Sequence, residues 1–574
     1  MTRVRLRLLA SLFATGLVVA GCQQAAGPGT EGPPEVEFPR SETVFTTGAE
    51  WGTYSNWNPL HSGGQATYVR QGIYETLFVF DPWTTELEPW LAADGEWVSD
   101  DEYVLRLREG VRWHDGEPLT AEDVVFTVNL RDAPGVPYAP LSDWLDEVVA
   151  EDDLTVRFTF SDLRAGEWDN WLYNHHILPE HKWSDVPPED LMSVAGDDRI
   201  VGTGMLKHHS HTEDRAVYER NDDWWAIDQL GVEMQPRYVV DLRNQSNEVV
   251  VPQLLRGEID LSNNFIPGVQ FLEGFGDTIT TFYPEDPFMI PANTAYLIPN
   301  HTRPPMDDAE FRRAMAFAID VQSIVDGVYH NIVQPSHNTG LLDIWSEYFD
   351  EAVVAEHGFR YDPRVARQIL SDAGYVDTNG DGFVERPDGE EISLTLIVPA
   401  GWTDWNEAAE VIAASLRDVG INVVTDFPDS PELDDLRDTG EFDLVINNDS
   451  GLSNTPAEHY TYLFQLPIQE RQSARNNMAR YENEQAWELT EQLWRVSVGD
   501  PGFQELMRQL QEISLVDMPA IPMWYNGLWS QVNNSAWSNW PSEGSDTAEY
   551  YPSTWGGIGE LKAYLMFTQI QPVG

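Results

Sequence analysis

The sequence is poor in cysteine and in lysine. Cys22 is the one cysteine in 574 residues, so the chain can form no internal disulfide and no multi-cysteine zinc site. Its lysines are Lys182, Lys207 and Lys562, and 34 basic residues stand against 95 acidic ones, a formal net charge of −61. Such a chain repels polyanions, which makes nucleic acid an unsuitable partner.

The acid excess also bears on the environment of the protein. Surfaces rich in acid and poor in lysine suit high salt, where repulsion between like charges is screened. We therefore expect a salt-adapted, halophilic source.

With 11% aromatic residues, including 22 tryptophans, the chain has ample apolar area to bury, and its length predicts two to four domains.

The first residues have the pattern of an export signal. Arg3, Arg5 and Arg7 precede an apolar run over 8–20, and roughly 13 residues is too short for a comfortable membrane span. The run ends in LVVAGC, which resembles the lipobox of bacterial lipoproteins, whose cysteine is acylated. We expect residues 1–22 to be a lipoprotein signal peptide, with Cys22 lipidated, and residues 23–40 to be a flexible tether. An ordinary signal with an incidental cysteine is the alternative.

Downstream, helical and strand patterns alternate. Residues 120–123 (TAED) form a capping box before a helix, and residues 307–310 repeat the device. Asp362-Pro363 begins another helix, which Gly374 closes. A strand pattern over 392–398 is followed by a helix from about 403 to 419, ended by Gly420, and a strand over 421–424. The pattern predicts a mixed α/β protein.

Six segments together resemble one family, the extracellular solute-binding proteins of ABC importers that bind dipeptides, oligopeptides, nickel or oligosaccharides. They occur in the family order at residues 105–124 (LRLREGVRWHDGEPLTAEDV), 201–204, 219–225, 255–260, 311–320 and 517–522. The resemblance implies two lobes joined by two hinge strands, with an extra domain inserted into lobe I. Lobe I would comprise 41–60, 200–300 and 525–574; the inserted domain would be 61–199, and lobe II 301–524.

The resemblance also implies the function. Such receptors are non-catalytic monomers that need no cofactor, enclose a solute between their lobes and deliver it to the permease subunits. This protein would be lipid-anchored at the outer face of the cell membrane, extracellular or periplasmic. A sugar-active enzyme and a sensor that does not feed transport are the alternatives outside this class. No nucleotide, nucleophile-elbow or HExxH motif supports an enzyme.

Several segments resemble the oligosaccharide-binding branch of the family. They are residues 398–405 (VPAGWTDW), 446–456 (INNDSGLSNTP), 522–529 (PMWYNGLW) and 551–557 (YPSTWGG). Peptide binders usually carry an aspartate four residues before the equivalent of Pro456, and here that residue is Leu452. We expect the ligand to be a β-linked gluco- or xylo-oligomer, and the alternative is a peptide.

The same segments supply the residue types that sugars require. A sugar offers apolar C–H faces and a rim of hydroxyls, so its site needs aromatic platforms and polar side chains. The candidate ligand-binding residues are Trp402, Asp404, Trp405, Asn448, Asp449, Asn454, Trp524, Trp529 and Trp555. For each tryptophan, ordinary packing in the core or hinge is the alternative.

Two motifs suggest metal binding. Asp377, Asn379 and Asp381 occupy the first, third and fifth positions of a calcium-loop pattern, but the twelfth is Asp388 instead of glutamate. Either a structural calcium ion or a plain acidic turn fits this segment. His208, His209 and His211 have the chemistry to bind nickel, and a solvated surface cluster is the alternative.

Overall fold

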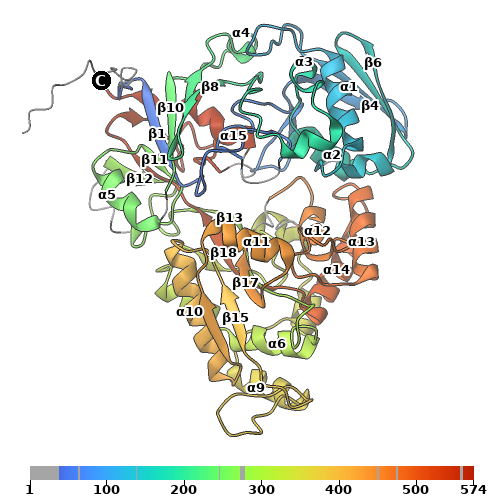
Figure 1. Cartoon of the computed structure of the whole chain (residues 1–574), viewed down its shortest axis with the longest axis vertical. Helices are drawn as coiled ribbons and strands as arrows, with labels where there is room; N and C mark the ends of the chain where they lie inside the picture. The colour runs from blue at the N-terminus through green and yellow to red at the C-terminus, as the bar shows by residue number, and fades with distance from the viewer. Residues whose placement is uncertain are drawn as a thin grey trace, which may run out of the picture. The chain divides into compact units, whose positions relative to one another are not determined.

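The computed structural model describes residues 38–574 except 62–64, 138, 245, 270, 272–277, 449–451, 473–475 and 556–559, and residues 39–574 form one unit. Cys22, the signal peptide and most of the predicted tether lie outside the described residues. Three larger sheets organise the described chain (Figure 1). They alternate with helices, which agrees with the predicted mixed α/β class.

A seven-stranded sheet forms what we call the first lobe. Its strand order is β12-β19-β11-β1-β10-β9-β8, with β1 parallel to β10 and β11. The strands come from distant parts of the chain: β1 (Thr43–Thr47), β8 (Leu206–His211), β9 (Arg215–Arg220), β10 (Tyr238–Leu242), β11 (Leu261–Ser262), β12 (Ile279–Thr281) and β19 (Gln531–Asn533). Helix α4 (Trp225–Leu230) connects β9 to β10, α5 (Val250–Leu255) lies between β10 and β11, and α15 (Glu560–Tyr564) follows β19 in the chain.

A four-stranded antiparallel sheet forms the inserted domain. Its order is β4-β5-β7-β6, from β4 (Ala92–Trp97), β5 (Glu102–Leu107), β6 (Leu145–Asp152) and β7 (Thr155–Phe160). Helices α1 (Ala121–Asn129), α2 (Ala165–Asn174) and α3 (Glu180–Trp183) lie beside it (Figure 1). The predicted capping box is confirmed, because Thr120 and Asp123 exchange both contacts at the start of α1.

A six-stranded sheet forms the second lobe. Its order is β14-β18-β13-β17-β15-β16, from β13 (Ile290–Pro299), β14 (Gln334–Pro335), β15 (Leu394–Ile397), β16 (Val423–Asp426), β17 (Leu444–Asn447) and β18 (Ile521–Leu528). One apolar core contains Leu396 and Ile446, and a second contains the adjacent Ile397 and Val445, as expected where alternate side chains of a strand point to opposite faces. Both faces are therefore covered.

Helices of the second lobe pack on these two cores. They are α6 (Ala309–Ala318), α7 (Val321–Gly327), α8 (Glu351–His357), α9 (Pro363–Asp372), α10 (Thr403–Asp418), α11 (Ser430–Thr439), α12 (Ala457–Phe464), α13 (Glu484–Arg495) and α14 (Phe503–Asp517). Asp362 caps α9 and Gly420 follows α10 with a positive φ of 94°, both as predicted. At α6 the cap is Asp308 instead of the predicted Asp307.

Two adjacent connections join the lobes. The chain crosses from β12 to β13 through residues 282–289, and returns from β18 to β19 through residues 529–530. The boundaries expected at 300 and 525 fall at the end of β13 and within β18, since both strands pair inside the second lobe. Among the residues that the structure describes, no helix combines the length and apolar character that a membrane crossing needs.

Candidate functional site

One edge of the six-stranded sheet faces the connections to the first lobe. Strands β15, β16 and β17 are parallel and end at this edge, β18 ends there too, and β13 begins there. The segments 398–405, 447–448, 290–293 and 526–530 therefore meet, and we call this region the cleft edge. Ligands of open α/β sheets bind outside the carboxyl ends of parallel strands, so this is the expected position for a site.

Trp402 lies at the cleft edge, just before α10. Its ring centroid lies 4.9 Å from that of Trp405 and 5.6 Å from that of Trp51, which belongs to the first lobe. Trp402 is half-buried, whereas Trp405 is 2% exposed and packs in the core beneath. Of the predicted pair, Trp402 keeps an exposed portion that a ligand can contact, and buried Trp405 packs against the Trp402 ring.

Asp404 is buried between the lobes. Asn247 of the first lobe donates its Nδ2 hydrogen to Oδ1 at 3.3 Å, and the Tyr329 hydroxyl donates to Oδ2 at 3.3 Å. Burial raises the pKa of Asp404 to about 7. In this conformation the carboxyl group is thus part of an interlobe hydrogen-bond network and is not an exposed ligand contact.

This network continues into the first lobe through asparagine side chains. Asn264 donates from Nδ2 to Asn247 Oδ1 at 3.2 Å, and Asn244 donates to Asn264 Oδ1 at 3.3 Å. The backbone N–H of Asn247 also donates to the Gly401 carbonyl at 3.2 Å. The start of α10 is therefore held against the first lobe by several polar contacts.

A second group of carboxamides lies on adjacent strands of the second lobe. Asn448 donates from Nδ2 to Asn293 Oδ1 at 3.0 Å, and Asn293 is the register partner of Asn526. Asn526 is buried, and its Oδ1 has no hydrogen-bond partner among the described residues. Asn448 itself is half-buried. Asp449, the next predicted residue, lies outside the described residues.

Asn454 connects the second lobe to the inserted domain. Its Nδ2 donates to the Gly166 carbonyl at 3.1 Å, and its Oδ1 accepts from the Tyr173 hydroxyl at 3.2 Å. Nearby, Arg495 pairs with Asp162 at 3.0 Å. Asn454 therefore helps to hold the lobes together, and its contact with a ligand stays a prediction.

The remaining predicted tryptophans lie at the hinge. Trp524 and Trp529 are 0% and 4% exposed, and both pack against Tyr329, with ring centroids 5.4 Å and 6.1 Å from it. Trp555 is half-buried, donates from Nε1 to the Gly48 carbonyl at 3.0 Å, and packs against the cores of both lobes. Trp524 and Trp529 are therefore packing residues, and Trp555 keeps an exposed portion.

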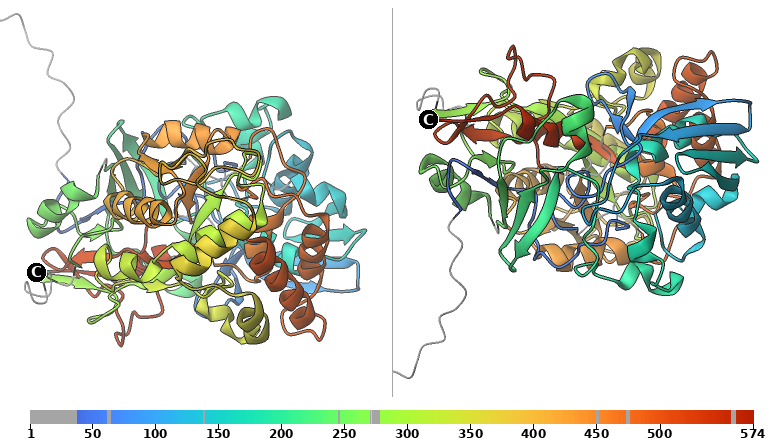
Figure 2. Two further views of the ribbon diagram at one scale, coloured as in Figure 1. Left: turned by 90° about the horizontal axis from the view of Figure 1, so that it is seen from below. Right: turned by 90° about the horizontal axis from the view of Figure 1, so that it is seen from above.

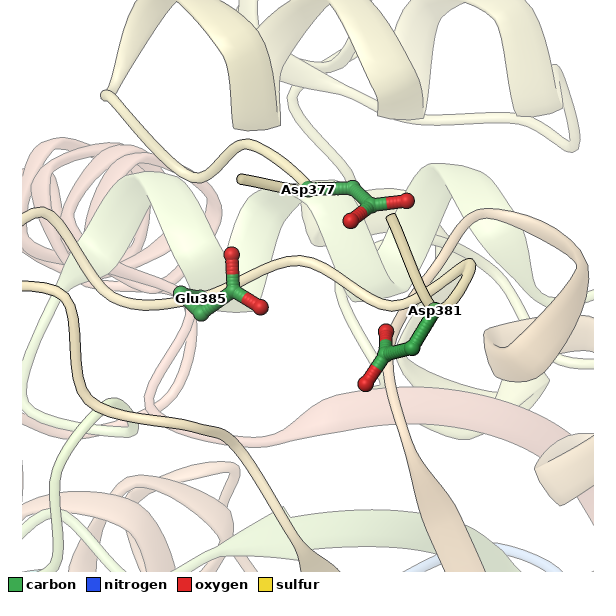
Figure 3. Close-up of side chains that lie close together, drawn as sticks. All are labelled: Asp377, Asp381 and Glu385. Atoms are coloured by element: carbon green, nitrogen blue, oxygen red, sulfur yellow. The ribbon is translucent and has the colours of Figure 1, made fainter. Parts of the chain in front are cut away.

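The acidic loop of the second lobe brings Asp377, Asp381 and Glu385 together, with ligand atoms within 4.8 Å of one another (Figure 3). Asp388 pairs with Arg386 at 2.9 Å instead. The Asp377 oxygens accept from the N–H groups of Gly380 and Gly382 at 2.6 and 3.0 Å, and buried Glu385 accepts from Thr378. The carboxylate oxygens of the loop therefore accept hydrogen bonds from donors of the same loop, as in an Asx-type turn.

The histidine cluster is a pair on strand β8. His208 Nε2 and His211 Nδ1 are 3.0 Å apart and share a hydrogen bond, so one of the rings is a donor and the other an acceptor. Burial, next to Trp57, lowers the pKa of His208 to about 4. The pair lies on the sheet of the first lobe and belongs to no cluster of three metal-ligating groups among the described residues.

Two lobes joined by two adjacent strands are the architecture of binding proteins that close around a solute by hinge motion. Residues 86–468 match the family described as "Bacterial extracellular solute-binding proteins, family 5 Middle". The chain belongs to this family of ABC-transporter solute-binding proteins. Its relatives are transport receptors and not enzymes, need no cofactor, and serve permease subunits.

Individual relatives differ in what they bind. A mannohexaose-bound periplasmic oligopeptide-binding protein from Thermotoga maritima is 39% identical over 93% of this chain and 99% of that one, with a TM-score of 0.89. Heme-binding protein A of Haemophilus influenzae is 25% identical over 456 residues, 73% of this chain and 76% of its own. A putative ABC transporter peptide-binding protein of Brucella ovis is 26% identical over 471 residues, 79% of each.

Sequence reasoning missed the first-lobe side of the site. Trp51 and Asn247 of the first lobe contact predicted residues, yet neither was a candidate, and the same holds for Tyr329 of the second lobe. The available signal was the density of asparagines in the first-lobe loops, at Asn244, Asn247, Asn263 and Asn264, which are all buried. Buried carboxamides need partners, and so they mark loops that meet another polar surface.

Proposed function

We propose that this protein captures an oligosaccharide between its two lobes and delivers it to an ABC permease. The observation that carries the proposal is the cleft edge, the one edge of the sheet that holds both half-buried Trp402 and the carboxamides of Asn293, Asn448 and Asn526. An indole face beside several neutral donors and acceptors suits a sugar ring and its hydroxyls. The similarity to a mannohexaose-bound protein at 39% identity supports the same ligand class.

The sugar that we expect from the sequence is a β-linked gluco- or xylo-oligomer. Mannose oligomers join this set because of the Thermotoga relative. Within the cleft, Trp402 and the exposed part of Trp555 would stack against sugar rings. Asn448, Asp449 and the first-lobe asparagines would take the hydroxyl groups, and hinge motion at residues 282–289 and 529–530 would enclose the ligand.

A peptide receptor is the second candidate, because curated relatives include peptide-binding proteins. A peptide would require a carboxylate for its α-amine. Leu452 occupies the expected position and packs against the core of the first lobe and inserted domain, while Asp404 is already held by Asn247 and Tyr329. These contacts favour the sugar over the peptide.

We also propose that Cys22 anchors the mature chain to the outer face of the membrane. In this arrangement the receptor remains next to its permease, and residues 23–40 serve as the tether. A Cys22→Ala variant expressed in the native host should move from the membrane fraction to the medium or periplasm. An unchanged membrane fraction would contradict the anchor.

Intrinsic tryptophan fluorescence tests the ligand class, at high salt because of the acid excess. Titration with cello-, xylo- and manno-oligosaccharides should give a saturable change, and mixed short peptides should give none. In Trp402→Phe the affinity should fall about three- to tenfold, which corresponds to a lost aromatic contact of about 0.5–1.5 kcal/mol. Trp97→Phe, on the inserted domain, is the control. A response to peptides alone would overturn the proposal, as would silence to both ligand classes.

A further inference from the structure

A groove separate from the cleft edge lies between the inserted domain and the second lobe. Its volume is about 450 Å³, within the roughly 300–1,000 Å³ typical of small-molecule sites. Helix α2 of the inserted domain forms one wall, and helices α12 and α13 form the other. Figure 2 shows the blue-green inserted domain beside the orange-red helices of the second lobe, and α2 contacts α13, far apart in the sequence. We call it the α2–α13 groove.

Each helix presents one face to the groove. Trp487, Glu491 and Trp494 recur at helical spacing along α13, and Glu458 and Thr461 do so along α12; Asn170 comes from α2. Residues three, four and seven apart lie on the same side of a helix, so these side chains share a surface. Trp487 is half-buried, which leaves part of its ring exposed, whereas Trp494 is 7% exposed and donates to Thr461 at 2.9 Å.

The chemistry of the lining narrows the choice of ligand. Glu458, Glu491 and nearby Glu167 oppose an anionic ligand, and Arg164 balances part of this charge through contacts with Glu167 at 3.3 Å and Glu491 at 4.0 Å. A purely apolar ligand would leave these groups desolvated, at a cost in free energy. Indole faces among carboxylates and carboxamides suit a neutral polyol with apolar faces, which is the description of a sugar.

The groove begins where the lobes meet. Asn170, which lines it, lies 3.5 Å from Asn454 Oδ1, and Asn454 follows strand β17 in the chain, which ends at the cleft edge. Arg495 and Asp162, paired at 3.0 Å, join the end of α13 to the inserted domain. The two walls therefore come from different lobes, so a ligand in the groove would contact both of them.

We propose that the α2–α13 groove binds the end of an oligosaccharide that extends past Asn454 from the cleft edge. This inference rests on the proposed function and adds a second contact region to it. The protein would then prefer long oligosaccharides over short ones. Trp487 would stack on a terminal sugar, and Glu458, Glu491 and Asn170 would accept or donate hydrogen bonds to its hydroxyls.

The test is a chain-length series measured by isothermal titration calorimetry on the mature chain at high salt. In the wild type, affinity should rise with length from disaccharides to hexasaccharides. In Trp487→Ala the dissociation constant of long oligomers should rise about three- to tenfold, the equivalent of one aromatic contact, with a smaller loss in Trp487→Phe. Trp97→Ala, which removes another half-buried indole of the inserted domain, should keep the length dependence.

The outcomes separate the two proposals. If the wild type binds sugars with no gain in affinity with length, or if Trp487→Ala weakens short and long oligomers equally, the groove proposal is overturned and the proposed function stands. If the wild type binds no sugar, both are overturned. If choline or arginine binds the wild type but not Trp487→Ala, and sugars show no length dependence, the groove takes an organic cation and the proposal is also overturned. Melting temperatures of all variants establish that they are folded.

Discussion

The Nδ2 group of Asn454 donates a hydrogen bond to the carbonyl oxygen of Gly166 at 3.1 Å. Asn454 belongs to the second lobe and Gly166 to helix α2 of the inserted domain, so this contact exists when the lobes are closed. A residue in this position stabilises the closed form whether or not it touches a ligand. The affinity of a closing receptor then depends on such interlobe contacts as well as on the site.

The first prediction concerns this contact. Asn454→Ala should raise the dissociation constant for oligosaccharides about five- to a hundredfold, because it removes two hydrogen bonds worth about 0.5–1.5 kcal/mol each. The effect should lie mainly in a faster dissociation rate, as measured by stopped-flow fluorescence. Asn379→Ala, on the exposed acidic turn, is the matched control. A changed ranking of sugars in Asn454→Ala would instead indicate that Asn454 contacts the ligand.

The second prediction concerns Asp404, whose pKa burial raises to about 7. In the unfolded chain an aspartate has a pKa of about 3.9, so between these values the folded protein holds a proton that the unfolded chain lacks. The free energy of unfolding should therefore fall as pH rises from about 4 to 7. Asp404→Asn should raise the melting temperature at pH 8 and change it little at pH 4.

The control for this prediction is Asp418→Asn, at the exposed end of the same helix α10. It should leave the pH dependence of the melting temperature unchanged. An Asp404→Asn variant with the same pH dependence as the wild type would mean that Asp404 is ionised in the folded protein throughout this range.

The third prediction concerns Glu75, a buried carboxylate that accepts hydrogen bonds from three indoles. Nε1 of Trp90, Trp224 and Trp225 lies 2.7, 3.1 and 3.0 Å from its oxygens. Glu75→Ala would leave three donors unpaired beside a cavity, at a cost of about 3–5 kcal/mol. Glu75→Gln keeps one acceptor and should cost less. Differential scanning calorimetry measures the melting temperatures of both variants. Equal melting temperatures for Glu75→Ala and the wild type would contradict the prediction that Glu75 stabilises the fold through these three hydrogen bonds.

The fourth prediction concerns metal dependence. Because backbone N–H groups already bind both Asp377 oxygens, the acidic loop should be stable without calcium. Dialysis against a chelator should change the melting temperature of the wild type by no more than about one degree. The melting temperature of Asp377→Asn should be the same with and without calcium. A rise of several degrees on adding calcium, abolished in Asp377→Asn, would show that the loop is a structural calcium site.

Local signals in the sequence predicted much of the fold. The capping residue Asp362 and the terminating Gly420 define helices whose ends the structure reproduces, because capping depends on a few neighbouring residues. The fold class followed from the six family segments. The expected domain boundaries remain a prediction; those at 300 and 525 fall at the end of β13 and within β18, two paired strands of the second lobe.

The site was harder to predict, because its contacts join distant parts of the chain. Asn454 pairs with Tyr173, 281 positions earlier, and Asp404 pairs with Asn247 of the other lobe. Tryptophan is also ambiguous: Trp402, just before α10, is half-buried, and Trp405, three positions later in the first turn of that helix, is in the core. A sequence gives the residue type, but the exposed fraction depends on which elements cover it.

The most direct test of the account is a calorimetric comparison of sugars and peptides on the mature wild-type protein at high salt. The account predicts saturable binding of cello-, xylo- or manno-oligosaccharides with a dissociation constant in the micromolar range or tighter, roughly −8 kcal/mol or more favourable, and no heat with short peptides. Saturable binding of peptides, with no heat from any of the oligosaccharides, would contradict it.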